Sequence, residues 1–176
     1  MAVNLSGRQL RDPGLVARVL GALERHQVEP TQLCLELTET ALIGEPDDAH
    51  GVLDPLSARG VRIALDDFGT GYSSLTHLQR LRADILKIDR SFVAQIGREP
   101  RDREIIAAVT AMAHALGMTV IGEGIETDAQ RHELVAVDCD EGQGYLLAAP
   151  LPADEIASLW TATQTPRSSE HHHALG

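Results

Sequence analysis

The chain has no run of basic residues, no long apolar segment and few cysteines, and each absence excludes a class of protein. Its 176 residues carry 15 Lys and Arg against 26 Asp and Glu, for a net charge of −11. A nucleic-acid polymer is therefore not an expected partner. No stretch reaches the roughly 20 apolar residues that cross a bilayer, and no secretory signal opens the chain. The sequence thus indicates a cytoplasmic protein without a membrane segment.

The two cysteines, Cys34 and Cys139, lie far apart and lack the spacing of a metal site. Cys34 belongs to an apolar run, which favours a buried thiol over a redox or metal role. This sparse use of cysteine fits a reducing compartment. An acidic chain can still bind an anionic ligand if metal cations lie between them, and such cations would have to be held by oxygen ligands.

Short apolar runs alternate with segments of helical periodicity along the chain. Apolar runs predict strands at 2–6, 33–40, 61–67, 85–89, 118–125 and 144–151. Helical patterns cover 12–26, 46–59, 73–81, 101–117, 127–137 and 153–160, with Asp12 and Thr127 as expected N-caps. Strand followed by helix, repeated at least four times, predicts a parallel sheet built from βα units.

Polar side chains at the strand ends favour a closed barrel over an open, doubly wound sheet. They are Asn4, Glu36, Asp66, Asp67, Lys87 and Glu123. In a (β/α)8 TIM-type barrel the strand ends converge on one mouth, whereas an open sheet needs only one or two such groups. A whole barrel takes about 250 residues, so we expect an incomplete α/β barrel of about six strands with its first strands missing.

The expected domain covers residues 1–160, and 161–176 reads as a disordered tail. His171 to His173 in this tail fit an expression-tag remnant or an incidental tract. The barrel would keep an open sheet edge, and such edges are normally covered or paired. We therefore expect self-association into a homo-oligomer through that edge.

The adjacent aspartates Asp66 and Asp67 pose an electrostatic problem at the end of an apolar run. Two carboxylates about 4 Å apart repel by roughly 4 kcal/mol at an effective dielectric of 20. Neighbouring strand side chains point to opposite faces, so both serve one centre only if the chain curls, which Gly69 and Gly71 permit. Divalent cations such as Mg²⁺ or Mn²⁺ would neutralise the pair, because these cations prefer oxygen ligands.

Each of these features also has an ordinary structural explanation. An isolated Asp-Asp pair is common in turns and caps, Lys87 could simply neutralise a strand glutamate, and the segment from Glu123 to Glu126 could be a solvated turn. The metal hypothesis depends on their joint occurrence at successive strand ends.

Six motifs, in this order, make the chain resemble the EAL domains, which are bacterial cyclic-di-GMP phosphodiesterases on a modified (β/α)8 barrel. They are Asn4-Leu5-Ser6, Glu36-Leu37-Thr38-Glu39, Asp66-Asp67-Phe68-Gly69-Thr70-Gly71-Tyr72-Ser73-Ser74, Lys87-Ile88-Asp89, Glu123-Gly124-Ile125-Glu126 and Gln143-Gly144-Tyr145. The resemblance runs from about residue 3 to residue 160. It implies hydrolysis of cyclic-di-GMP to linear pGpG with two divalent cations, Mg²⁺ or Mn²⁺.

The resemblance also implies a role for each motif residue. Asn4, Glu36 and Asp66 would bind one metal, and Asp66 would bridge to a second that also meets Asp67 and Glu123. Lys87 would contact the attacking water and, with Glu123, form the catalytic pair. Supporting roles are implied for Gln143 lining the mouth, Glu39 anchoring the loop after the paired aspartates, Glu126, and Asp89 as an orienting group.

The Glu-Ala-Leu triplet that names the family is absent from this sequence. In the family its glutamate is a metal ligand on an early strand, and loss of such a ligand should cost at least the 10–100-fold typical of a supporting residue. A catalytically inactive EAL-like fragment that binds nucleotide or another protein is therefore an alternative. A third possibility is an unrelated magnesium-dependent barrel enzyme of lyase type, which would bind a small carboxylate or phosphate instead.

Overall fold

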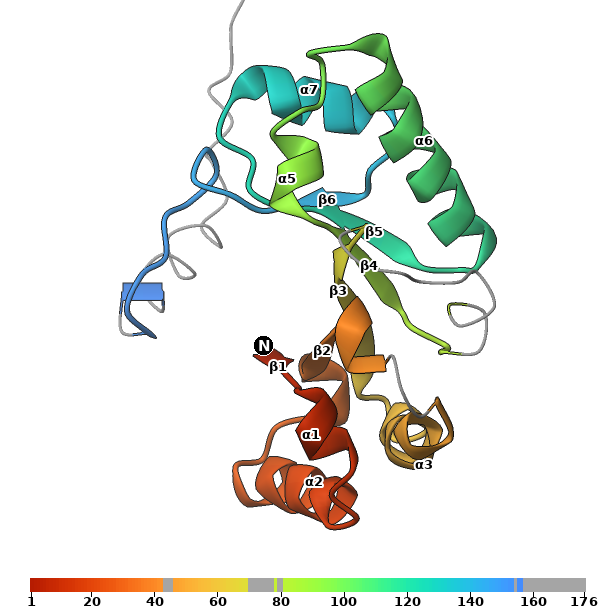
Figure 1. The fold of residues 1–176 in the computed structure, drawn as a ribbon. Coiled ribbons are helices and arrows are strands. Elements are labelled where there is room, and N and C mark those ends of the chain that lie inside the picture. The colour runs from red at the N-terminus through yellow and green to blue at the C-terminus, as the bar shows by residue number, and fades with distance from the viewer. Residues whose placement is uncertain (43–45, 70–77, 79–80, 154, 157–176) are drawn as a thin grey trace, which may run out of the picture.

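Six strands form one parallel sheet in which the spatial order of the strands follows their order in the sequence (Figure 1). The computed structural model describes the chain except residues 43–45, 70–77, 79–80, 154 and 157–176. The strands are β1 (Ala2–Asn4), β2 (Cys34–Thr38), β3 (Arg62–Phe68), β4 (Ile85–Ile88), β5 (Thr119–Gly122) and β6 (Glu141–Gly142). All five strand pairs are parallel, so the predicted α/β class is confirmed, and the described residues form six strands.

Helices connect the strands. They are α1 (Gly7–Leu10), α2 (Leu15–Arg25), α3 (Pro46–Ser57), α5 (Arg90–Val93), α6 (Pro100–Ala115) and α7 (Asp128–Ala136), with short 3-10 turns η1 (Pro30–Gln32) and η2 (Glu39–Leu42). In Figure 1, α1 to α3 flank the part of the sheet made by β1 to β3, and α5 to α7 flank the part made by β4 to β6. Within the described residues, no helix is both long enough and apolar enough to span a membrane.

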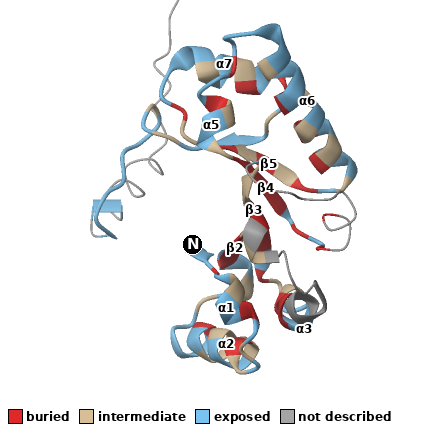
Figure 2. Cartoon of the chain, in the orientation of Figure 1, coloured by how far each residue is buried: buried red, intermediate tan, exposed pale blue. Residues whose placement is uncertain are grey.

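The two faces of the sheet differ in composition, as period-2 alternation requires. On β2, Leu35 and Leu37 belong to the main apolar core, which the helices cover (Figure 2). Cys34 instead joins Ala64 and Ile85 in a separate small apolar cluster. Glu36 shares the parity of Cys34, so it projects from this second face and away from the helix-packed core.

Of the two residues expected to cap helix N-termini, Thr127 does so and Asp12 does not. Thr127 caps α7 as expected, because its side chain accepts a hydrogen bond from the Gln130 N–H. Asp12 does not cap α2, which begins at Leu15 after Gly14. Its carboxylate accepts from the Gly14 N–H at 2.8 Å and so closes the turn before the helix.

The last strand lies earlier than the sequence indicated. The apolar run 144–151 was expected to form it, but β6 is Glu141–Gly142 and the residues after it turn away from the sheet. Backbone hydrogen bonds from Leu147 and Ala148 to the Gly144 carbonyl hold that turn. The expectation failed because an apolar run of this length does not by itself fix the structure that it forms, and here Tyr145, Leu147 and Leu151 stay exposed. The helices expected at 73–81 and 153–160 fall largely outside the described residues.

Candidate metal centre

Lys87 lies at the centre of the polar strand ends. Its ammonium contacts one carboxylate oxygen from each of three neighbouring elements: Glu36 at 3.0 Å, Asp66 at 2.9 Å and Glu123 at 2.6 Å. Glu36 lies on β2, Asp66 on β3 and Glu123 directly after β5, while Lys87 is the third residue of β4. Parallel pairing brings these ends to one edge of the sheet, as the barrel interpretation predicted.

The cluster is largely withdrawn from water. The side chain of Lys87 is 6% exposed, and those of Glu36, Asp66 and Glu123 are 14%, 13% and 15% exposed. Charges at this depth need partners, because water no longer stabilises them. The ion pairs with Lys87 supply part of that compensation.

Asp67 joins the cluster through an irregularity in β3. The pairing of β3 with β4 shifts register between Leu65 and Phe68, and Asp67 has a left-handed backbone with φ of +55°. The curl that the sequence placed at Gly69 and Gly71 therefore begins at Asp67 itself. Left-handed backbone is tolerated better by aspartate than by most residues, which makes this position compatible with its side chain.

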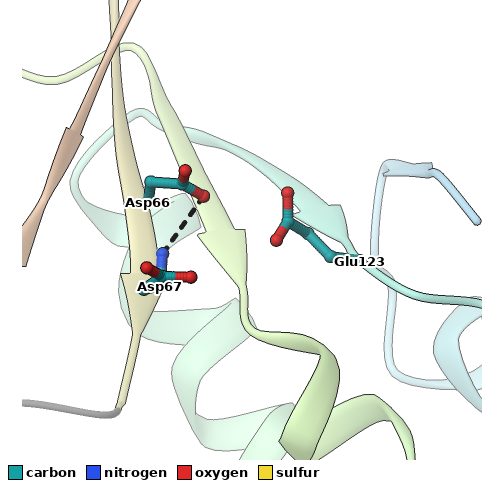
Figure 3. A group of neighbouring side chains, drawn as sticks. All are labelled: Asp66, Asp67 and Glu123. Atoms are coloured by element: carbon teal, nitrogen blue, oxygen red, sulfur yellow. Dashed lines mark hydrogen bonds between the residues drawn. The ribbon is translucent and has the colours of Figure 1, made fainter. Parts of the chain in front are cut away.

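Three carboxylates, Asp66, Asp67 and Glu123, approach one another closely enough to share a cation (Figure 3). One oxygen of each lies within 4.8 Å of the others, and the Asp67 N–H donates to Asp66 Oδ1 at 3.1 Å. Figure 3 shows Glu123, at the end of β5, reaching toward the aspartates on β3, and β4 lies between these two strands. This oxygen-only donor set suits a hard divalent cation.

Lys87 offsets the negative charge of the cluster only in part. Burial raises the pKa of the Glu123 carboxyl, as do the nearby charges of Asp66 and Glu36, and Lys87 opposes this rise only in part. Burial also raises the pKa of Asp67, with the Asp66 charge adding to it. Burial and neighbouring carboxylates thus disfavour the ionised forms of Glu123 and Asp67. Added positive charge would relieve that cost, so the residues present fit a divalent metal.

Asn4 lies at the edge of this cluster and lines a groove. It pairs with Glu36 in the β1–β2 register, and both line a hollow of about 670 Å³ together with Ser6, Arg8 and Arg11. The two arginines were not singled out from the sequence. Their place directly after the Asn-Leu-Ser motif was the signal that could have indicated them, since residues following a strand end face the same mouth.

Gln143 connects the cluster to a second groove. Its Nε2 donates to Glu123 Oε1 at 2.6 Å, and it lines a hollow of about 390 Å³ with Arg90, Glu126 and Tyr145. Glu126 is exposed, and its backbone N–H donates to Gln130 at 2.8 Å at the start of α7. The structure therefore brings Gln143 to the site, and Glu126 to the wall of the adjoining groove.

The remaining two predicted residues lie beside the site. Asp89 follows β4 and caps α5 by accepting from the Ser91 N–H at 2.9 Å, so it fixes the chain next to Lys87. Glu39 begins η2 directly after β2, and its side chain is buried. The loop that Glu39 was expected to anchor falls within 70–77, outside the described residues, so that role stays a prediction.

Both the sequence and the fold are similar to those of known proteins. The EAL domain family model matches residues 1–150. The bifunctional diguanylate cyclase/cyclic di-GMP phosphodiesterase MucR of Pseudomonas aeruginosa is 44% identical over 156 residues, which are 89% of this chain and 23% of MucR. The chain therefore spans less than a quarter of the length of this relative.

The fold of this chain is also similar to those of solved structures. The MucR phosphodiesterase in complex with c-di-GMP superposes with a TM-score of 0.83 at 44% identity, covering 88% of this chain and 63% of that one. For the EAL domain of Mycobacterium smegmatis DcpA the TM-score is 0.88 at 38% identity, with coverages of 94% and 74%. For the manganese and c-di-GMP complex of Klebsiella pneumoniae BlrP1 it is 0.77 at 34% identity, with coverages of 82% and 37%.

The structure thus describes part of a TIM-type barrel whose strand ends gather carboxylates around one lysine, and the family model spans most of its length. This chain belongs to the EAL domain family.

Proposed function

We propose that the domain to which this chain belongs hydrolyses cyclic-di-GMP to linear pGpG with two divalent cations, Mg²⁺ or Mn²⁺. The observation that carries this proposal is the cluster of Asp66, Asp67 and Glu123 at the strand ends, with one oxygen of each within 4.8 Å of the others. The c-di-GMP complex of a relative at 44% identity supports the substrate. A relative solved with manganese and c-di-GMP supports the cation.

The ligand sets proposed for the two cations share Asp66. Asn4, Glu36 and Asp66 would hold one, because Asn4 pairs with Glu36 in the β1–β2 register and the Lys87 ammonium contacts both Glu36 and Asp66. Asp66, Asp67 and Glu123, which form the close cluster, would hold the other. Bound cations supply Lewis acidity, which activates a water and neutralises charge on the phosphodiester.

The protein groups would position the reactants. Lys87 would donate a hydrogen bond to the attacking water and offset the negative charge that develops during attack. Gln143 would hold the Glu123 carboxylate in place through its 2.6 Å hydrogen bond. Arg8, Arg11 and Arg90 line the two adjoining grooves and offer positive charge to the phosphates of a dinucleotide.

A second candidate function is nucleotide binding without turnover. The two grooves and the close carboxylate cluster support it, because these features could hold a dinucleotide whether or not it is hydrolysed.

Incubation of the purified chain with c-di-GMP and Mn²⁺, followed by chromatographic detection of pGpG, tests both candidates. We expect pGpG to form, and we expect a chelator or Glu123→Gln to abolish it, whereas Glu24→Gln on the exposed face of α2 leaves the rate unchanged. Thermal stabilisation by c-di-GMP without product would favour the binding module. A folded sample with neither turnover nor stabilisation would rule out a direct nucleotide role.

A further inference from the structure

The ammonium of Lys87 is surrounded by carboxylates inside the protein. A lysine ammonium has three N–H donors and no acceptor, and this one meets three carboxylate oxygens at 2.6, 2.9 and 3.0 Å. The residue is only 5% exposed. Lys87 donates a hydrogen bond to Asp66 Oδ1 at 2.9 Å, and its ion pairs with Glu36 and Glu123 hold the ammonium among carboxylates, which limits its access to a water or a phosphate. The role proposed for Lys87 in hydrolysis is therefore favoured when at least one carboxylate first finds another positive partner.

The oxygens that hold Lys87 belong to the carboxylates proposed as metal ligands. Asp66 and Glu123 are members of the close carboxylate cluster, and Glu36 is the third partner of the ammonium. Glu123 Oε1 accepts from both Lys87 and Gln143 at 2.6 Å, so this oxygen already has two donors. A cation that binds these carboxylates must therefore compete with the ammonium for them.

We propose that Lys87 is the internal counterion of the metal-free centre: its ammonium takes the place of a divalent cation among Glu36, Asp66 and Glu123, and metal binding displaces it from at least one of them. The proposal rests on the proposed metal site, and does not depend on which substrate is hydrolysed. Two consequences follow. The centre stays folded without metal because Lys87 offsets part of its negative charge, and metal binding releases the Lys87 ammonium from a carboxylate at the moment when the reaction needs it.

The change in metal affinity when Lys87 is removed distinguishes a competing cation from a residue that only supports the metal ligands. A residue that only orients metal ligands lowers the affinity by about 10–100-fold when it is removed. A competing cation does the opposite, because its removal frees the carboxylates and ends the repulsion between two positive charges a few ångströms apart. We therefore expect Lys87→Met to bind Mn²⁺ at least about tenfold more tightly than the wild type.

The same variant should depend on metal for stability. Removing one partner of a buried ion pair leaves uncompensated charge, so the Tm of Lys87→Met without metal should fall by about 10 °C. Saturating Mn²⁺ should restore most of this loss, and should raise the Tm of the variant more than that of the wild type.

Lys87 is the only lysine in the sequence, and this provides a direct spectroscopic probe. Lysine-specific ¹⁵N labelling gives a single side-chain ammonium signal in the NMR spectrum. Mg²⁺ is diamagnetic, so it can shift this signal without paramagnetic broadening. We expect the signal to be protected from exchange with water in the metal-free protein. During titration with Mg²⁺ it should shift and exchange faster with water.

The test combines calorimetric titration of Mn²⁺, thermal unfolding and the ammonium spectrum on the full chain, without nucleotide. Arg103→Met is the control, since this cation pairs with Glu133 at 3.6 Å on another part of the surface, and its Mn²⁺ affinity should match that of the wild type. Weaker Mn²⁺ binding by Lys87→Met, no binding by either protein, or an ammonium signal indifferent to saturating Mg²⁺ would overturn the proposal. If Lys87→Met is unfolded without metal, folding in Mn²⁺ supports the proposal and failure to fold there refutes it. Failure of c-di-GMP turnover alone would count against the proposed function and leave this inference standing.

Discussion

Gln143 donates a hydrogen bond to Glu123 through the same carboxylate oxygen, Oε1, that binds the Lys87 ammonium, and both contacts are 2.6 Å long. Gln143 follows β6 and Glu123 follows β5, so the contact joins two neighbouring strand ends. A carboxylate held from two directions has little freedom to rotate. Such fixed orientation is what supporting residues supply to metal ligands.

Gln143→Ala should therefore lower the affinity for Mn²⁺ by about tenfold while the protein stays folded. Titration calorimetry with Mn²⁺ measures the change. Gln95→Ala is the matched control, because Gln95 is exposed and lies outside the centre. Equal affinities for the two variants would show that Glu123 does not depend on Gln143 for its orientation.

Gly144 can be replaced only at a high cost in stability. A Cβ at this position would lie 2.2 Å from the backbone N and O of Ile125, which cannot move aside as a flexible side chain would. Gly144→Ala should lower the free energy of unfolding by about 3 kcal/mol, the upper end of the range for overpacking, as measured by urea denaturation.

Gly21→Ala serves as the control for Gly144→Ala. Gly21 lies inside α2 with nothing within 4 Å of its Cβ position, so alanine there should stabilise the protein by about 0.5–1 kcal/mol. A Gly144→Ala protein as stable as the wild type would contradict the close approach of the two backbone segments.

Asp67 has a left-handed backbone, and burial and the Asp66 charge disfavour the ionised form of its carboxyl. Both Asp67→Asn and Asp67→Ala remove the charge, but alanine pays the steric penalty of positive φ, which is about 1–2 kcal/mol. We expect Asp67→Ala to be less stable than Asp67→Asn by at least about 1 kcal/mol in urea denaturation without metal.

The pH dependence of stability should also change at Asp67. Its pKa is raised by burial and by Asp66, so the folded state retains this proton above the unfolded value of about 3.9, and stability falls as the pH rises through that window. Asp67→Asn should remove this decline. An unaltered pH profile would contradict the burial of the carboxyl.

Asp140 ties the end of α6 to β5. Its Oδ2 accepts from the Val120 N–H at 2.7 Å and contacts His114 Nε2 at 2.8 Å. The Val120 N–H, and then His114, hold the pKa of Asp140 below its usual range. A lowered pKa means that the stabilising effect is present above the unfolded value of about 3.9 and is lost as the pH falls through the folded pKa.

Asp140→Asn should therefore be less stable than the wild type by about 0.5–1 kcal/mol near pH 7, a modest value because the carboxylate is partly exposed and screened. The difference should shrink as the pH is lowered below about 4. Asp138→Asn, two residues away and exposed, should show no such pH-dependent difference. A gap that stays constant down to acidic pH would argue against the ionised contact.

The local pattern of the sequence determined five of the six described strands, most of the described helices and the set of polar residues at the strand ends. Period-2 alternation placed Glu36 on the face opposite Leu35 and Leu37, and the structure confirms this. These features depend on neighbouring residues, so a single sequence is enough to predict them. The strand expected at 144–151 failed because the turn at Gly144 depends on contacts with Ile125 and not on local apolarity.

Only the tertiary structure decided how the charges pair. The resemblance implied that Lys87 would contact the attacking water, and the sequence left open that it neutralises a strand glutamate. In the fold its ammonium lies against three carboxylates. Lys87 and Asp66 are 21 residues apart, and no local pattern specifies which carboxylate an ammonium reaches. Strand register and the irregularity at Asp67 set those distances, and distance in a dry environment decides which charges compensate one another.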